Sequence, residues 1–157
     1  MSGARVRILC LGNELLADDG AGPAVAALLR SKGTAPGCEI VESCASGLGW
    51  MDDIVGADRL ILVDAIVTGR AAPGTVHVLR EEDLGEGYGA NPHTMSLGAA
   101  LALARQLGLD APSEVVVLAV EAADVETFGA PMSESVRQGV REIARLCEEL
   151  ARGSQLP

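Results

Sequence analysis

Acidic and imidazole side chains stand at three places in the sequence where they could do chemistry. Asp18 and Asp19 lie in a glycine-rich loop over residues 12–22, Asp64 ends an apolar run, and His93 follows a proline. These side chains could form a three-ligand site for a divalent metal with open coordination positions. The ligands would be one carboxylate from the pair at 18 and 19, the carboxylate of Asp64 and the imidazole of His93. This mixture of oxygen and nitrogen ligands suits nickel, zinc or manganese.

The loop over residues 12–22 must also be weighed as a nucleotide-binding loop. It contains neither the G-x-G-x-x-G pattern of dinucleotide-binding folds nor the G-x-x-x-x-G-K-[ST] pattern of P-loops. Asp18 and Asp19 would repel a phosphate at the start of the following helix, whereas the positive end of that helix stabilises carboxylates by about 0.3–1 kcal/mol each. The two acids therefore either help to begin the helix or serve as ligands.

Other catalytic arrangements have weaker support. There is no G-x-S-x-G nucleophile motif, and Ser43, Ser46 and Ser96 have no histidine and aspartate partners in a recognisable pattern. Cys44 and His93 could form a thiol–imidazole pair. None of the four cysteines forms a C-x-x-C motif, which excludes a zinc knuckle and a thioredoxin-like pair and favours a reduced, cytosolic setting.

The elements that must position these side chains alternate between strand and helix. Short apolar runs predict strands over residues 6–11, 39–41, 59–63, 75–79 and 115–120. Helical spacing predicts helices over residues 23–30, 48–55, 94–107 and 133–151. Pro23 is expected at the first helical position of its helix, and Thr94 is expected as the N-cap of the third helix.

The predicted strands are apolar on both faces, which is typical of a parallel sheet covered on both sides. We therefore predict an α/β fold with three layers, a twisted, mostly parallel sheet of about five strands between helices, in a single domain over residues 1–157. Ligands of such sheets bind outside the carboxyl ends of the strands. The positions to inspect are thus the 12–22 loop, Asp64 and Glu121, whereas His77 lies within a strand and is expected to be structural or solvent-facing.

Composition and charge exclude several classes of protein. The chain has 157 residues, of which 48% are hydrophobic and 22% charged, and a formal net charge of −10. An acidic chain is a poor partner for nucleic acid or an anionic membrane. No apolar run approaches the roughly 18 residues of a membrane span, and the N-terminus lacks the cleavage site of a secretory signal. We expect a cytoplasmic protein that binds neither nucleic acid nor membrane.

At these residues the chain resembles the maturation endopeptidases of nickel-iron hydrogenases. Three motifs carry the resemblance in the family's order and separation, and it covers nearly the whole chain. They are Gly12-Asn13-x-Leu15-x-x-Asp18-Asp19-Gly20-x-Gly22, Leu62-Val63-Asp64-Ala65, and Pro92-His93 with Leu97. The chain departs from the family pattern at Cys10, where glycine is usual, and over residues 42–47, where an Asp-x-Gly-Thr-like turn is common.

The resemblance implies a reaction and a role for each residue. Members of the family are endopeptidases that remove a short C-terminal peptide from the hydrogenase large-subunit precursor after nickel has been inserted. By resemblance, Asp19, Asp64 and His93 contact the metal, Asp19 and Asp64 take part in catalysis, and the nickel is carried by the precursor. Asp18 is expected to orient the loop. Whether hydrolysis is of the aspartic type or metal-assisted stays open.

Two other functions fit the same residues. A non-catalytic nickel-dependent chaperone or checkpoint protein for the same precursor would use the three ligands without cutting. A small-molecule-binding α/β module would use the acids only to begin a helix. Loss of a C-terminal peptide from the precursor distinguishes the endopeptidase from both.

Overall fold

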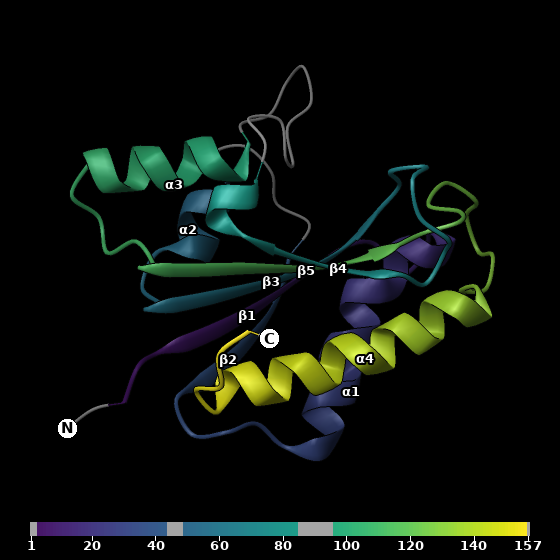
Figure 1. Ribbon diagram of the computed structural model, residues 1–157, viewed down its shortest axis with the longest axis horizontal. Helices are drawn as coiled ribbons and strands as arrows, with labels where there is room; N and C mark the ends of the chain where they lie inside the picture. The colour runs from purple at the N-terminus through teal and green to yellow at the C-terminus, as the bar shows by residue number, and fades with distance from the viewer. Residues whose placement is uncertain (1–2, 44–48, 85–95, 157) are drawn as a thin grey trace.

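A five-stranded sheet forms the centre of the fold (Figure 1). The computed structural model describes residues 3–43, 49–84 and 96–156. The strands of this part are β1 (Val6–Leu11), β2 (Cys38–Ser43), β3 (Arg59–Ile66), β4 (Val76–Arg80) and β5 (Glu114–Glu121). Their order across the sheet is β2-β1-β3-β5-β4, with all neighbours parallel except β4, which pairs antiparallel with β5. The predicted mostly parallel sheet is confirmed.

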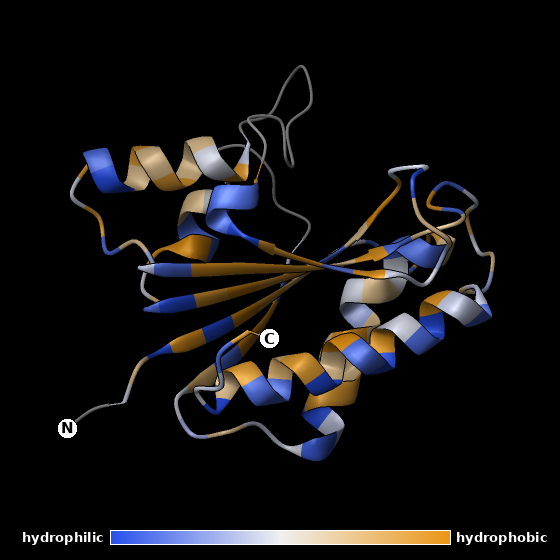
Figure 2. Ribbon diagram, in the orientation of Figure 1, coloured by the Kyte–Doolittle hydropathy of each residue, from blue (hydrophilic) through white to orange (hydrophobic). Residues whose placement is uncertain are grey.

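Helices cover the sheet on both faces and complete the three predicted layers. Figure 1 shows α1 (Ala21–Lys32) and α4 (Glu134–Ala151) on one face, and α2 (Trp50–Ile54) and α3 (Leu97–Gln106) on the other. Covering both faces of the sheet explains why its strands are mainly hydrophobic along their length, as Figure 2 shows. The predicted apolar face of the last helix is confirmed, because its residues are all buried: Val136, Val140, Ile143, Cys147 and Leu150.

Alternating side chains along each strand enter two separate cores. Ile61 and Val63 of β3 pack with residues of α1 and α4, whereas Leu60 and Leu62 pack with residues of α2 and α3. Asp64 follows Leu62 by two positions, so its side chain points to the face that α2 and α3 cover. The alternation of side chains along β3 therefore decides on which face of the sheet the Asp64 carboxylate lies.

Two predicted boundaries near the candidate site are wrong. β3 continues to Ile66, so Asp64 lies inside the strand and pairs with Ala119 of β5 instead of following the strand. The first helix begins at Ala21, two residues before Pro23, and its second residue Gly22 packs against Leu11 at the end of β1. Pairing with β5 extends β3 beyond the end that local residue types indicate, and α1 follows directly on the turn Ala17–Gly20.

The predicted N-cap of α3 is also wrong. Thr94 lies outside the described residues, and the N-cap is Ser96, whose hydroxyl accepts a hydrogen bond from the backbone N–H of Ala99 at 3.1 Å. Ser96 is itself buried, which removes competition from water for this bond.

We expect Ser96→Ala to lower the free energy of unfolding by about 1 kcal/mol, because the first turn of α3 loses the acceptor for one N–H group. Urea denaturation measures the change. Ser31→Ala, at an exposed hydroxyl near the end of α1, is the control and should stay within about 0.5 kcal/mol of the parent. Equal effects of the two substitutions would contradict the capping role.

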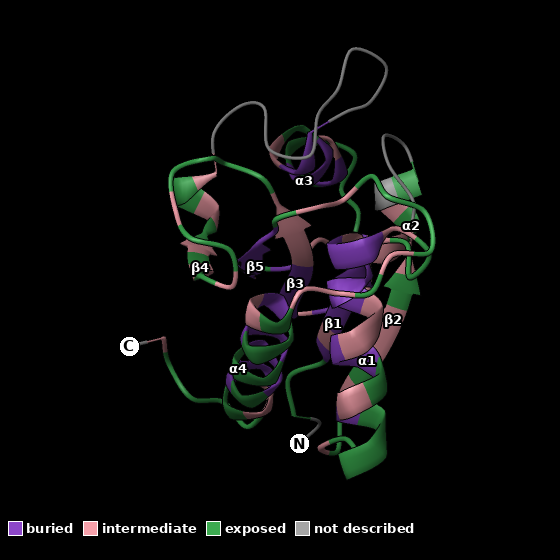
Figure 3. Cartoon of the chain, turned by 90° about the vertical axis from the view of Figure 1, so that its right-hand side faces the viewer, coloured by how far each residue is buried: buried purple, intermediate pink, exposed green. Residues whose placement is uncertain are grey.

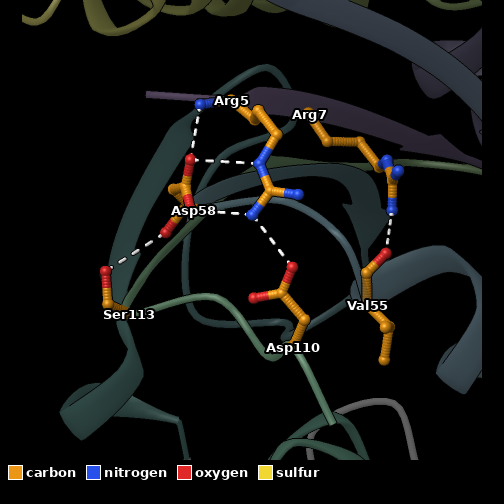
Figure 4. A network of polar contacts seen from close by, with 6 residues as sticks. All are labelled: Arg5, Arg7, Val55, Asp58, Asp110 and Ser113. Carbon is orange, nitrogen blue, oxygen red and sulfur yellow. Dashed lines mark hydrogen bonds and ion pairs between the residues drawn. The ribbon is translucent and has the colours of Figure 1, made fainter. Parts of the chain in front are cut away.

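Hydrogen bonds and ion pairs of charged side chains connect the segments at the amino ends of the strands (Figure 4). The Arg5 guanidinium donates to Asp58 at 3.1 Å and to Asp110 at 2.9 Å, and Arg7 donates to the carbonyl of Val55 at 2.7 Å. The hydrogen bonds from Arg5 hold the pKa of Asp58 below its usual value. This network lies at the opposite end of the sheet from Asp64.

In the described part of the chain, no helix is both long and apolar enough to cross a membrane.

Candidate active site

The loop after β1 folds back tightly over the end of the strand. Gly12 has φ 136°, and a Cβ atom there would lie 2.0 Å from the carbonyl oxygen of Asp19. A Cβ at Gly22 would lie 2.0 Å from the carbonyl oxygen of Leu11. Only glycine allows both close approaches, so these two glycines bring Asp19 to the carboxyl end of β1.

Asp19 is held by the backbone of the same loop. The backbone N–H of Asn13 donates to Oδ2 of Asp19 at 2.9 Å, and the side chain of Asn13 accepts from the N–H of Leu15 at 3.0 Å. The other carboxylate oxygen, Oδ1, has no hydrogen-bond partner among the described residues, and the side chain is partly exposed. Asp19 is therefore fixed in place with one oxygen available to a ligand.

Asp64 lies on β3, the strand next to β1. The backbone N–H of Ala65 donates to its Oδ1 at 2.8 Å. Burial raises the pKa of Asp64 to about 7, the hydrogen bond from Ala65 opposes this, and the charge of Asp19 raises it further. β3, which carries Asp64, contacts the turn that carries Asp19 (Ala17–Gly20), so the structure brings these two predicted site residues together.

The position of the two carboxylates follows from the topology. The chain runs from β1 to β2 on one side of β1 and then returns to β3 on its other side. At such a reversal, the loops that leave the two adjacent strands diverge and open a crevice at their carboxyl ends, which is where ligands of open α/β sheets bind. Asp19 and Asp64 lie at this reversal.

Asp18 has a different role from Asp19. It is fully buried, and its Oδ2 accepts from the N–H groups of Ala123 and Asp124 at 2.9 and 3.0 Å. Ser133 donates to the same carboxylate through its N–H at 2.7 Å and its hydroxyl at 2.9 Å. Burial alone would raise the pKa of Asp18, but these hydrogen bonds outweigh it and lower the pKa. Asp18 therefore joins the loop after β1 to the connection between β5 and α4 by hydrogen bonds, in keeping with its predicted role of orienting that loop.

Glu121, the third position to inspect, is also structural. It is buried, and it accepts hydrogen bonds from the N–H of Thr68 at 2.7 Å, from the Thr68 hydroxyl, and from His77 Nε2 at 3.2 Å. These bonds, led by that from the Thr68 hydroxyl, hold the pKa of Glu121 below its usual value. Glu121 thus fixes the connection between β3 and β4, and His77 has the structural role that its mid-strand position predicts.

Three of the predicted or alternative positions cannot be placed. His93 and Cys44 lie outside the described residues, and so does most of the departing stretch 42–47. Within the described ranges, no group of three or more His, Cys, Asp or Glu side chains could hold a metal ion, so the predicted triad stays a prediction. Cys10, the other departure, is buried in β1, and burial raises the pKa of its thiol to about 12.

A groove of about 410 Å³ lies between the loop after β1 and β2. Gly12, Asn13 and Glu14 line one side and Glu42 and Ser43 of β2 the other. Sequence reasoning did not assign a role to Asn13, although an asparagine before a tight turn is a recognisable sign of an Asx turn. A peptide lying in this groove would pass the residue that holds Asp19.

We expect Asp64→Asn to stabilise the protein at pH 8 and to have little effect at pH 4. An Asp in an unfolded chain has a pKa of about 3.9, whereas the pKa of Asp64 in the fold is about 7. Between these values the folded state binds the extra proton, so the stability of the parent falls as the pH rises. Asn stays neutral, and the variant should gain about 4 kcal/mol at pH 8, since each of the roughly three pKa units between the folded and unfolded states is worth about 1.4 kcal/mol. Urea denaturation at both pH values measures the difference, and a gain independent of pH would contradict the prediction.

Comparison with known proteins identifies the family. The chain matches the hydrogenase maturation protease family, HycI, over residues 23–150, a range that includes Asp64 and His93. It is 33% identical over 140 residues to the hydrogenase expression/formation protein HupM of Azotobacter chroococcum. The match covers 87% of this chain and 66% of HupM, just under two thirds of that protein. It is 30% identical over 119 residues to the hydrogenase 2 maturation protease of Escherichia coli, covering 74% of this chain and 72% of that protein.

The fold agrees with the same family. The hydrogenase maturating endopeptidase HybD from E. coli superposes with a TM-score of 0.80 at 25% identity, covering 94% of this chain and 92% of that chain. The predicted α/β fold and the predicted resemblance are confirmed, because an independent sequence match and a structural match lead to proteins of one kind. The chain belongs to the hydrogenase maturation protease family.

Proposed function

We propose that this protein is a cytoplasmic endopeptidase that removes the C-terminal peptide of a nickel-loaded hydrogenase large-subunit precursor. The observation that carries the proposal is the pair of carboxylates, Asp19 and Asp64, at the carboxyl ends of adjacent strands in a member of this protease family. The free thiols of Cys10, Cys38 and Cys147, in the described part of the chain, suit a reducing compartment.

The two carboxylates have the properties that peptide hydrolysis requires. Water must lose a proton as it attacks the carbonyl carbon, and the leaving amine must gain one. A group with a pKa near the working pH exchanges protons in both directions, and the pKa of Asp64 is about 7. Asp19, held by Asn13, is oriented to bind or position the attacking water. We assign Asp64 the proton transfer and Asp19 the positioning.

The donor set also fits the nickel of a loaded precursor. Asp19 uses one carboxylate oxygen for the N–H of Asn13, and Asp64 uses one for the N–H of Ala65, which leaves each with an oxygen for a metal. We propose that Asp19, Asp64 and His93 bind this nickel as part of the substrate, and that the contact distinguishes loaded from empty precursor. Carboxylates and an imidazole are ordinary ligands for nickel.

We expect the purified protein to bind nickel weakly, because three ligands make a poorer site than a closed set of four. Titration calorimetry with nickel chloride should show binding that chelator washing reverses. His93→Ala should weaken it further, and His77→Ala, which changes the other of the two histidines, should leave it unaltered. Stoichiometric nickel that survives chelator washing would argue that the metal is resident, not delivered by the precursor.

The function is tested directly with the precursor. The protein is incubated with nickel-loaded and with empty hydrogenase large-subunit precursor, and the mass of each precursor is measured. We expect only the loaded precursor to lose a C-terminal peptide. A stable complex without loss of mass would support the non-catalytic chaperone instead.

A further inference from the structure

A second groove, next to the candidate active site, has a composition that indicates a binding role. It has a volume of about 330 Å³ and lies between α1, the loop after β1 and the connection between β5 and α4. Its lining is apolar apart from one charged residue, Glu14. The apolar residues that form its walls include Ala17, Pro23, Ala24, Ala27, Pro131 and Met132. We call it the apolar groove.

The apolar groove is continuous with the groove between the loop after β1 and β2. Glu14 and Pro23 line both of them. Asn13, which holds Asp19, lines the second groove beside Glu14. A chain segment seated in the apolar groove could therefore extend past Glu14 toward the two carboxylates without leaving the surface.

The two loops that border the apolar groove carry exposed large apolar side chains. Leu15 is 50% exposed and Phe128 is 73% exposed. The N–H of Gly129 donates to the carbonyl of Leu15 at 2.8 Å, so the two loops that carry these side chains are joined. A single exposed leucine is ordinary, but exposed apolar side chains on loops that border an apolar groove are typical of an interaction surface.

The walls of the apolar groove are held before any partner binds. Asp18 binds Ala123, Asp124 and Ser133, and this fixes both ends of the segment that carries Phe128 and Met132. Asp124 in turn accepts hydrogen bonds from the N–H groups of Glu126 and Thr127 at 2.9 and 3.0 Å. A preformed surface loses less conformational freedom on binding, which favours association. Figure 3 shows exposed and partly exposed residues along α1, which forms the other wall.

The charge of the surroundings indicates what binds there. Glu14 is exposed and forms no ion pair within the described residues, and Glu126 is a second exposed acid on the connection from β5 to α4. No lysine or arginine occurs among residues 12–20 or 122–133, the two loops that border the groove. An apolar surface with uncompensated negative charge is complementary to a segment that carries apolar and positively charged side chains.

We propose that the apolar groove docks a segment of the hydrogenase precursor that has an apolar side chain beside a positively charged one. The apolar side chain would lie against Ala24, Ala27 and Met132, and the positive charge would meet Glu14. This inference rests on the proposed function, because it supplies the recognition surface for the same substrate. It makes Glu14 and Ala27 determinants of specificity, not of the chemical step.

Two substitutions test the docking surface, each with a matched control. Ala27→Tyr fills the groove from an exposed position of α1, and Ala102→Tyr makes the same change at an exposed position of α3 on the other face. Glu14→Lys reverses the charge at the groove, and Glu82→Lys makes the same reversal at a distant exposed acid. Cleavage of nickel-loaded precursor is measured over a range of precursor concentrations.

We expect Ala27→Tyr and Glu14→Lys each to raise KM at least tenfold, with the loss of rate recovered as the precursor concentration rises. The two controls should stay within twofold of the parent. The effect of Glu14→Lys should shrink at high salt, whereas that of Ala27→Tyr should not. Binding of precursor to the same variants in an Asp19→Asn background should weaken in parallel.

The outcomes separate this inference from the proposed function. If the parent does not cleave the precursor, the proposed function fails, whereas cleavage with KM unchanged in Ala27→Tyr and Glu14→Lys overturns the docking surface alone. Sedimentation of the parent shows whether a second copy of this chain covers the groove. A dimer that Ala27→Tyr converts to a monomer without changing KM would also overturn the proposal.

Discussion

Asp19→Asn is expected to abolish cleavage of the precursor while leaving the protein as stable as its parent. Asn has nearly the same shape as Asp, so it can still accept the hydrogen bond from Asn13 that holds residue 19. It carries no charge, and a neutral amide is a much poorer ligand for a divalent metal and cannot polarise water as a carboxylate does. The rate should fall on the order of 100-fold or more, as for other residues of a catalytic set.

The measurement compares variants at equal folded fraction. Melting temperature and near-UV circular dichroism establish that Asp19→Asn is folded, and the mass of the precursor is then followed with time. Cleavage at the parental rate would remove Asp19 from the active site. A large drop in melting temperature would instead show that the Asp19 carboxylate holds the loop.

Asp18→Asn is expected to have the opposite profile, with a large loss of stability. The carboxylate is buried and accepts four hydrogen bonds, three from backbone N–H groups and one from a hydroxyl. The amide has only one acceptor oxygen, and its NH₂ group would face donors that need an acceptor. Hydrogen bonds to a charged group are strong, and unsatisfied buried donors are costly, so we expect a loss of about 3 kcal/mol or more.

The pH dependence of this loss provides a second test. The pKa of Asp18 in the fold lies below its usual value, so its contribution to stability is present above about pH 4 and is lost as the pH falls through the folded-state pKa. The difference between the parent and Asp18→Asn should therefore shrink in acid. Denaturant titrations at pH 7 and pH 3 measure it. A difference below about 1 kcal/mol at pH 7 would mean that Asp18 only helps to begin a helix, as its sequence position alone allows.

The neighbouring aspartates show what the local pattern can and cannot distinguish. Both stand before the same helix, and only the resemblance to the family separated a ligand at 19 from an orienting residue at 18. The structure separates them because Gly12 and Gly22 let the loop fold back on β1, which buries Asp18 against residues 123–133. Those residues are more than a hundred positions away in the sequence, so no local pattern contains them.

The sequence by itself determined the class of fold and the three motifs, because both depend on local information. Strands apolar on both faces require cover on both faces, and their alternation with helices leads to a mostly parallel sheet. Glycines, aspartates and their spacing are likewise visible without a structure. The family that those motifs predicted is the family that the comparisons identify.

Only the tertiary structure decided which of these side chains meet and what each one does. Pairing with β5 extends β3 beyond Val63, and the reversal from β2 to β3 places Asp64 beside Asp19. Glu121, the last residue of β5, is instead buried, accepts hydrogen bonds from Thr68 and His77, and is structural. Strand order, register and loop packing arise from contacts between distant parts of the chain. The roles of Asp19, Asp64 and Glu121, which lie near the carboxyl ends of three strands, therefore differ without any local sign in the sequence.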